Sequence, residues 1–192
     1  MIKIFFDVET TGTNPKQHSI VQLSGLIELD DEVVDSFDYD IRPHPKAKIE
    51  AEALRINNKT EEQILGFPPM EDAHRAFVKK LGKYINKFDS KDKAYLIGFN
   101  NRQFDDIFLR MFFELCGDKF FGSWFWQDSL DVLVLASQYL LDRRTGMPSF
   151  KLKRVARELG IVVDEKKLHD SVYDVELTRE IYRITTGLEI EI

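Results

Sequence analysis

Two acidic residues interrupt an otherwise apolar stretch at the start of the sequence. Asp7 and Glu9 fall within IKIFFDVET (residues 2–10), whose Ile, Phe and Val content is typical of a buried strand. Because side chains alternate along a strand, these two carboxylates should point to the same face. Burying them side by side is unfavourable unless a cation offsets their charge, and oxygen ligands suit Mg²⁺ or Mn²⁺. The pair therefore predicts part of a metal site; the alternative is a strand end where both acids are solvated.

A second segment carries carboxylates that could join this pair. Residues 98–105, GFNNRQFD, run from a buried strand into a helix, so Asp105 falls in the first helical turn. The helix dipole favours an ionised carboxylate there, and active sites of α/β folds tend to lie beyond strand ends of this kind. The neighbouring Asp106 is an equally good carboxylate, and either acid could simply stabilise the start of its helix. Spacing alone does not choose between them.

A third segment, LHDSVYD at residues 168–174, supplies a histidine and a further acid. Asp170 is predicted to cap the last helix, which places Asp174 within its first turn and a half and leaves His169 in the preceding loop. Five helical residues turn through ~500°, so His169 and Asp174 would not share a face even within one helix. A loop histidine beside a helix-borne ligand suits a base that moves in when substrate arrives. The alternative is an ordinary exposed loop residue.

The elements that must position these residues follow from hydrophobic periodicity and turn chemistry. Besides the first strand, strands are predicted at 20–28, 33–41, 94–99 and 125–127, the first three forming an antiparallel meander. Helices are predicted at 49–54, 60–65, 71–88, 104–115, 128–141, 150–159 and 170–186. Thr60 and Asp128 are expected to cap two of them, with Gln63 completing a capping box. This order favours an α/β fold with helices packed on a mixed sheet.

Taken together, the acidic segments resemble the DEDD family of 3′-5′ exonucleases. FDVETTG (6–12) is similar to the first motif of the family and NRQFD (101–105) to the second. The five-residue step from His169 to Asp174 is similar to the third motif in the histidine-bearing DEDDh branch, and the likeness is greatest to the proofreading (epsilon) exonucleases of bacterial replicative polymerases. Asn100 stands where the second motif often has His, and Ser171 and Val172 stand where the third usually has Ala and Leu.

The resemblance implies an RNase H-like fold, a mixed five-stranded sheet flanked by helices, in one exonuclease domain over residues 1–192. It also implies two Mg²⁺ ions, which Mn²⁺ could replace, and a histidine that deprotonates the attacking water. The implied ligands are Asp7, Glu9, Asp105 and Asp174, and the implied base is His169. Two metal ions roughly 3.5–4 Å apart can stabilise both the attacking and the leaving oxygen at phosphorus. The expected reaction releases nucleoside 5′-monophosphates from the 3′ end of single-stranded nucleic acid, with DNA favoured.

Substrate-binding residues follow partly from the resemblance and partly from charge. In the family, residues just after the first motif contact the terminal nucleotide, which points to Thr10 and Thr11; Asn101 and Phe104 of the second motif are expected to shape the site. The stretch 143–157 has six basic residues and no acidic one, namely Arg143, Arg144, Lys151, Lys153, Arg154 and Arg157. In an acidic chain this stretch is a candidate phosphate track, or else a solvated loop and helix face.

Composition limits the remaining classes of protein. The chain has 192 residues, of which 43% are hydrophobic, and a net charge of −6, which argues against a protein that coats nucleic acid non-specifically. Cys116 is the only cysteine, so a reducing, cytoplasmic location is expected. We expect no membrane span, since no apolar run approaches ~20 residues, and no signal peptide. The expected partners are single-stranded 3′ ends; a polymerase is another, although no tail dedicated to one follows the last predicted helix.

Two other functions fit the same residues. The first is an RNA-trimming exoribonuclease or an oligonucleotide scavenger of the same family, because a contact to the 2′-hydroxyl cannot be placed from sequence. The second is a non-catalytic nucleic-acid-binding module on the same fold. The complete set of acids and the histidine opposes the second, because buried carboxylates destabilise a protein that binds no metal.

Overall fold

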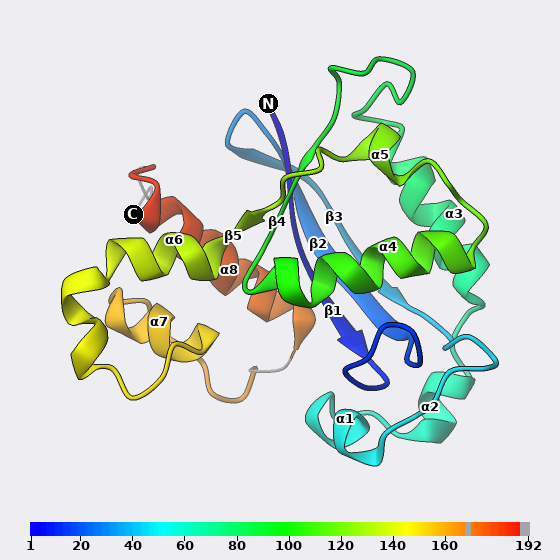
Figure 1. The fold of residues 1–192 in the computed structure, drawn as a ribbon, viewed down its shortest axis with the longest axis horizontal. Helices are drawn as coiled ribbons and strands as arrows, with labels where there is room; N and C mark the ends of the chain where they lie inside the picture. Colours follow the sequence, from blue (N-terminus) through cyan, green and yellow to red (C-terminus); the bar gives the residue numbers. More distant parts are fainter. Residues whose placement is uncertain (168–169, 189–192) are drawn as a thin grey trace.

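A five-stranded mixed sheet forms the centre of the molecule (Figure 1). The computed structural model describes residues 1–167 and 170–188. The strands are β1 (Ile2–Thr10), β2 (Ile20–Leu29), β3 (Glu32–Asp40), β4 (Tyr95–Gly98) and β5 (Leu130–Asp131), in the order β3-β2-β1-β4-β5. The first three strands form the predicted antiparallel meander, and β4 and β5 run parallel to β1 and to one another. The predicted fold class is confirmed.

Helices cover both faces of this sheet, and Figure 1 shows α4 crossing one face while α8 lies behind the other. The helices are α1 (Ala51–Ile56), α2 (Glu61–Leu65), α3 (Met70–Leu81), α4 (Asp105–Leu115), α5 (Phe121–Trp124), α6 (Val132–Tyr139), α7 (Leu152–Glu158) and α8 (Ser171–Thr185). Short 3₁₀ helices occupy η1 (Asn101–Gln103) and η2 (Leu141–Gly146). In the described part of the chain, no helix combines the length and apolar content needed to cross a membrane.

β1 contributes to a different core on each face because its side chains alternate. Ile4 and Phe6 pack with α3 and α4 in an aromatic-rich core that includes Phe77. Phe5 points the other way, into a core built with α6, α7 and α8, where its ring meets that of Tyr182 at 5.3 Å. Odd-numbered residues of β1 therefore face α8, and Asp7 and Glu9 are among them.

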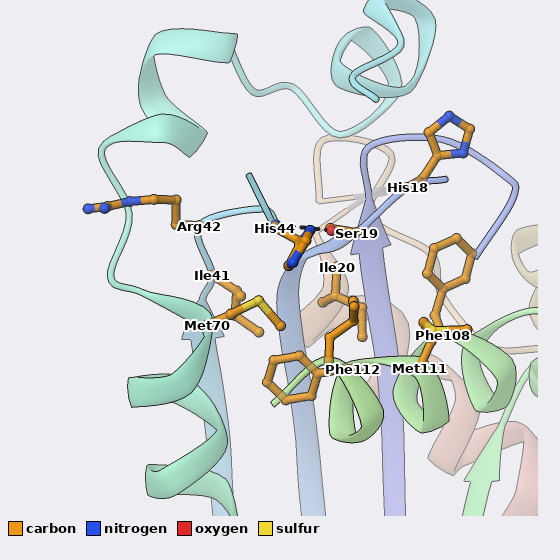
Figure 2. A pocket seen from close by; sticks show the side chains of 11 residues that line it. His18, Ser19, Ile20, Ile41, Arg42, His44, Met70, Phe108, Met111 and Phe112 are labelled. Carbon is orange, nitrogen blue, oxygen red and sulfur yellow. Dashed lines mark hydrogen bonds between the residues drawn. The ribbon is translucent and has the colours of Figure 1, made fainter. Parts of the chain in front are cut away.

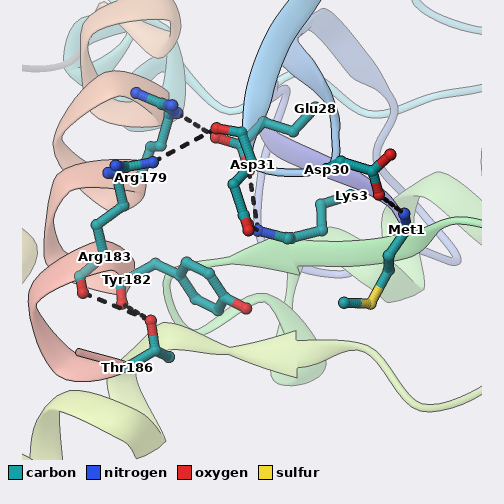
Figure 3. Close-up of polar contacts among 9 residues, drawn as sticks. All are labelled: Met1, Lys3, Glu28, Asp30, Asp31, Arg179, Tyr182, Arg183 and Thr186. Carbon is teal, nitrogen blue, oxygen red and sulfur yellow. Dashed lines mark hydrogen bonds and ion pairs between the residues drawn. The ribbon is translucent and has the colours of Figure 1, made fainter. Parts of the chain in front are cut away.

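A buried ion cluster joins α8 to the sheet near the start of β1 and the end of β2 (Figure 3). Lys3 and Glu28 are 2% and 1% exposed, and their side chains pair at 3.1 Å. Arg179 of α8 donates to the other oxygen of Glu28 at 2.5 Å, and Lys3 also pairs with Asp31. Buried charges are tolerated when they are paired, and removing one partner of such a group typically costs about 3–5 kcal/mol. The cluster thus holds α8 against β1 and β2.

Several helix ends agree with the predictions. Thr60 and Gln63 form the predicted capping box at α2, with Thr60 N–H donating to Gln63 Oε1 at 2.7 Å and Gln63 N–H to Thr60 Oγ1 at 3.2 Å. Asp170 caps α8 by accepting the Val172 N–H at 3.0 Å, also as predicted. Both caps satisfy backbone donors that a helix start leaves without partners.

Other boundaries differ from prediction. The helix predicted over 71–88 ends at Leu81, because Gly82 closes it and turns follow; Ile85 stays buried, which had prolonged the apolar pattern. The last strand is β5 rather than 125–127, where Phe125 makes only a single bridge to Ala94. The cap of α6 is Asp131, not Asp128: its carboxylate accepts the Leu133 N–H at 3.0 Å. Between the helices predicted at 128–141 and 150–159, the chain forms η2.

Candidate active site

Asp7 and Glu9 lie near the C-terminal end of β1, on the face that α8 covers. Both side chains are partly buried, whereas Val8 between them is buried on the opposite face. The prediction that the two carboxylates share a face is therefore confirmed. The antiparallel register sets Ser24 opposite Asp7 and Gln22 opposite Glu9 on β2.

Asp105, the first residue of α4, reaches β1 through a backbone contact. Its Oδ1 accepts the N–H of Val8 at 3.2 Å. That N–H is available because β4 pairs with β1 only as far as Phe5, after which the chain turns away at Asn100, whose φ is 64°. Asn adopts this left-handed conformation more readily than most residues, which suits it to the position where the family often has His.

Asp106 has different hydrogen-bond partners from the neighbouring Asp105. Its carboxylate accepts from Asn101 Nδ2 at 3.0 Å and from the hydroxyl of Ser129, next to β5. Asn101 is fully buried, and a Cβ added to Gly98 would lie 2.7 Å from its Cβ, so Gly98 is needed for this close packing. The ring of Phe104 packs against that of Phe108 in a tilted arrangement, with the centroids 4.9 Å apart. Asn101 and Phe104 thus shape the turn that presents Asp105.

α8 brings Asp174 toward the same acids. Ser171, in the first turn of α8, contacts Ser24 of β2 through their hydroxyls at 2.6 Å, and both residues are fully buried. This contact gives Ser171 a partner that the family's usual alanine would not have. Asp174 follows within one turn, and its charge acts on Asp7. The predicted base His169 lies outside the described residues.

The electrostatics of these carboxylates reflect burial and mutual repulsion. Burial, followed by the charges of Asp105, Glu9 and Asp174, raises the pKa of Asp7 well above its usual value. Burial also raises the pKa of Asp105 to about 8, although the hydrogen bond from Val8 opposes the shift. The pKa of Glu9 rises to about 7 through burial, while the charge of Lys59 lowers it. These acids are costly to ionise together without a counter-charge.

The donor chemistry of the cluster fits a divalent cation. Every candidate ligand is a carboxylate, and hard ions such as Mg²⁺ and Mn²⁺ prefer oxygen ligands. Within residues 1–167 and 170–188, no three acidic, cysteine or histidine side chains are already gathered closely enough to form a finished metal cage. Carboxylates that repel one another are expected to stay apart until a cation draws them together. The assignment of Asp7, Glu9, Asp105 and Asp174 as metal ligands stays a prediction.

We expect the metal-free protein to be less stable at pH 8 than at pH 5. The raised pKa values mean that the folded state binds more protons than the unfolded state between about pH 4 and pH 8. The free energy of unfolding therefore falls as pH rises through this window. The measurement is a series of melting curves in EDTA at several pH values. It compares the parent with Asp105→Asn, which lacks the titrating carboxyl group of Asp105. A difference in Tm between the two proteins that does not vary with pH contradicts the expectation.

Thr10 and Thr11 use their side chains inside the protein. The Thr10 hydroxyl donates to the carbonyl of Gly12 at 2.8 Å, and the Thr11 hydroxyl accepts the Ser19 N–H at 3.0 Å. Asn57 Nδ2 donates to the carbonyl of Thr10 at 2.9 Å. These bonds fix the loop after β1 beside the acids. A contact of either threonine with a nucleotide stays a prediction.

The basic stretch 143–157 is not one continuous cationic surface. Arg143 pairs with Glu158 at 3.8 Å, and Glu165 faces both Arg157 and, at 4.0 Å, Lys153. Arg144 instead lies over the ring of Phe150, with its guanidinium carbon 4.4 Å from the centroid. Two acids that follow the stretch in the sequence thus pair with three of its six basic residues. Substrate contact by the residues of this stretch stays a prediction.

A small cavity lies away from the acids, under α4 (Figure 2). His18, Ile20 and Phe112 are among the residues that line it, and Ser19 Oγ accepts the His44 N–H at 3.1 Å beside it. Its volume of about 10 Å³ is near the smallest that holds one water molecule. It is a packing defect between β2 and α4 and has no room for a nucleotide.

Sequence reasoning missed four residues beside the acids. Gln22 and Ser24 both donate to Asp38 of β3, and Lys59 donates to Gln22. The available signal was weak: Gln22 and Ser24 are polar residues two apart in the apolar strand IVQLSGLIEL. Only the strand register shows that they stand opposite Glu9 and Asp7.

Comparison with known proteins gives consistent relatives. The model of the family RNase_T, described as an exonuclease, matches residues 4–182. The PolC-type DNA polymerase III of Clostridium perfringens is 24% identical over 95% of this chain and 11% of its own length. The DNA polymerase III subunit epsilon of Buchnera aphidicola is 23% identical over 97% of this chain and 71% of its own.

Solved structures agree on the fold. E. coli Exonuclease I in complex with a dT13 oligonucleotide has a TM-score of 0.77 at 20% sequence identity, covering 96% of this chain and 41% of that protein. A zinc-bound form of its complex with single-stranded DNA gives a TM-score of 0.78 at 21% identity, covering 97% and 40%. The chain thus spans about a tenth of the PolC-type polymerase and two fifths of Exonuclease I.

Proposed function

Since this chain belongs to the RNase_T family, as an exonuclease of the DEDD 3′-5′ type, we propose that it removes nucleotides one at a time from the 3′ end of single-stranded DNA. The observation that carries the proposal is electrostatic: burial and neighbouring charges raise the pKa values of Asp7 on β1 and Asp105 on α4, and the charge of Asp174 on α8 acts on Asp7. The products would be nucleoside 5′-monophosphates. The relatives named as DNA polymerases, and the oligonucleotide in the Exonuclease I complex, support DNA as the substrate.

Each acid has a distinct support for its proposed role as a metal ligand. Asp7 and Glu9 are placed on one face by the alternation of side chains along β1, and Asp105 is positioned by its hydrogen bond from the N–H of Val8. Asp174 is positioned by α8, whose first turn contacts Ser24. When bound, two Mg²⁺ or Mn²⁺ ions would stabilise the attacking and leaving oxygens of an in-line displacement. The protein would fix the positions of these ions, because each carboxylate lies on packed secondary structure.

His169 is the proposed general base, which accepts a proton from the attacking water. It precedes Asp170, whose carboxylate caps α8, so the backbone next to it is fixed at the helix start. Histidine has an ordinary pKa of ~6.5, which suits proton transfer near neutral pH. The terminal nucleotide is proposed to lie against the loop at Thr10 and Thr11, and the strand to leave past Arg144, Lys151 and Arg154. The names of the relatives also support a proposal that the chain acts beside a DNA polymerase.

The test of this function is digestion of single-stranded DNA labelled at either end. With a 3′ label we expect labelled mononucleotide from the first time points, and with a 5′ label a ladder that shortens step by step. A matched RNA oligonucleotide should be degraded more slowly, and excess EDTA should stop both reactions. Cleavage of a circular single strand, release of a 5′ nucleotide first, or undiminished digestion in EDTA would each contradict the proposal.

A further inference from the structure

A row of polar side chains runs alongside the acids on β2 and β3. Gln22 and Ser24 donate to the same oxygen of Asp38, at 2.8 Å and 2.7 Å. Directly paired residues of neighbouring strands project to the same face, so Gln22 and Ser24 stand beside Glu9 and Asp7 on the α8 side. The row therefore forms one wall of the candidate active site.

Lys59 stands at the Glu9 end of this wall. Its ammonium donates to Gln22 Oε1 at 2.7 Å, and its positive charge acts on Glu9 and on Asp40. An ammonium has three N–H donors, and the bond to Gln22 uses one of them. Because Gln22 is neutral, this bond orients the ammonium without cancelling its charge. In this respect Lys59 differs from Arg143, which is paired with an acid.

The backbone of Lys59 is held on both sides. Asn58 before it has a left-handed φ of 53°, and the Lys59 N–H donates to the carbonyl of Leu54 at 3.0 Å, the closure that commonly ends a helix. Thr60 after it begins the capping box of α2. A lysine between two such fixed helix ends has less freedom than an ordinary surface lysine, so less entropy is lost when it binds an anion.

We infer that Lys59 binds a phosphate of the substrate backbone at the Glu9 side of the site. The inference rests on the proposed function, and the reason is electrostatic. A cluster of carboxylates repels a polyanion wherever the cluster's charge is not offset, and a fixed cation beside it supplies local attraction. An ammonium with remaining donors binds phosphate oxygens as a point charge. Lys59 would thus be a substrate-contacting residue that favours binding of the strand without taking part in proton transfer.

The test compares Lys59→Gln with two matched variants. Lys59→Gln should raise KM for single-stranded DNA roughly 5- to 20-fold with kcat nearly unchanged, because a charge-assisted contact made in both ground and transition states is lost. The slope of log KM against log salt concentration should also decrease in magnitude by ~0.7, which is the change expected when one phosphate contact to a single strand is lost. Lys59→Arg keeps the charge and should retain most of the parent behaviour. Lys79→Gln removes the same charge from an exposed position on α3 and should change neither quantity.

A binding measurement separates this effect from turnover. Fluorescence anisotropy of a labelled oligo(dT) on an Asp7→Asn background, with and without Lys59→Gln, should show the same weakening and the same loss of salt dependence. If the parent releases no 3′ nucleotides, the proposed function fails. If the parent is active but Lys59→Gln leaves KM and the salt slope unchanged, the inference is wrong. It is equally wrong if the variant needs more Mg²⁺ at an unchanged KM for DNA, since Lys59 would then act only on Glu9.

Discussion

Asp7→Asn is expected to lower kcat by roughly 10²–10³-fold or more, because it removes an anionic ligand from the proposed metal centre that would stabilise the transition state. Asp7 is the acid on which the charges of Asp105, Glu9 and Asp174 all act, so its loss affects the whole cluster. In EDTA the same variant should melt at a higher temperature than the parent, because a buried, repelled carboxylate becomes a neutral amide of equal size. At this chain length each kcal/mol corresponds to roughly 2–4 °C in Tm.

Kinetics and calorimetry on one set of proteins provide the measurement. Mg²⁺ should raise the Tm of the parent by mass action and that of Asp7→Asn much less. Asp128→Asn is the matched control, since Asp128 is exposed and its replacement changes the net charge equally. Parent-like activity in Asp7→Asn, or a parent Tm that millimolar Mg²⁺ does not move, would refute the metal-binding role of this acid.

His169→Ala is expected to lower kcat by roughly 10²–10⁴-fold, the usual contribution of a general base. Affinity for Mg²⁺ should barely change, because the acids remain. The rate of the parent should rise with pH as the histidine loses its proton, and the variant should lack that rise. Metal-bound water also titrates near neutral pH, so the comparison between the two proteins is what decides.

The measurements for this second variant are a pH–rate profile and a metal titration. His44→Ala serves as the control, because His44 is another loop histidine and lies beside the small cavity under α4 (Figure 2). Loss of Mg²⁺ binding in His169→Ala would make His169 a ligand or a structural residue, and the assignment of general base would be incorrect.

Much of the fold could be predicted because local rules and tertiary packing agree. Period-two alternation placed Asp7 and Glu9 on one face, and the caps at Thr60 and Asp170 needed only local chemistry. The predicted end of the helix over 71–88 was wrong, because buried residues continue along the chain after the helix has ended. Ile85 remains in the core after α3 has ended, so hydrophobic spacing continued past the helix and hid the stop at Gly82.

The site was predictable only in part, because its last details depend on contacts between distant segments. Asp105 and Asp106 are both in the first turn of α4, and the difference between them comes from the N–H of Val8 on another strand. The basic stretch could not be assessed alone, since Glu165 lies beyond it and neutralises Arg157. Lys59 gave no sequence signal, because its position beside Glu9 depends on strand register and a helix end.

The attachment of α8 to β1 and β2 also affects when, during synthesis on the ribosome, the candidate site can form. β1 is synthesised first and α8 last among the described elements, yet the Lys3–Glu28–Arg179 cluster and the core around Phe5 need both. A nascent chain that lacks α8 leaves Glu28 without Arg179 and lacks Asp174. In the proposed mechanism a chain that lacks α8 therefore cannot degrade nucleic acid, and nuclease activity begins only after α8 has docked.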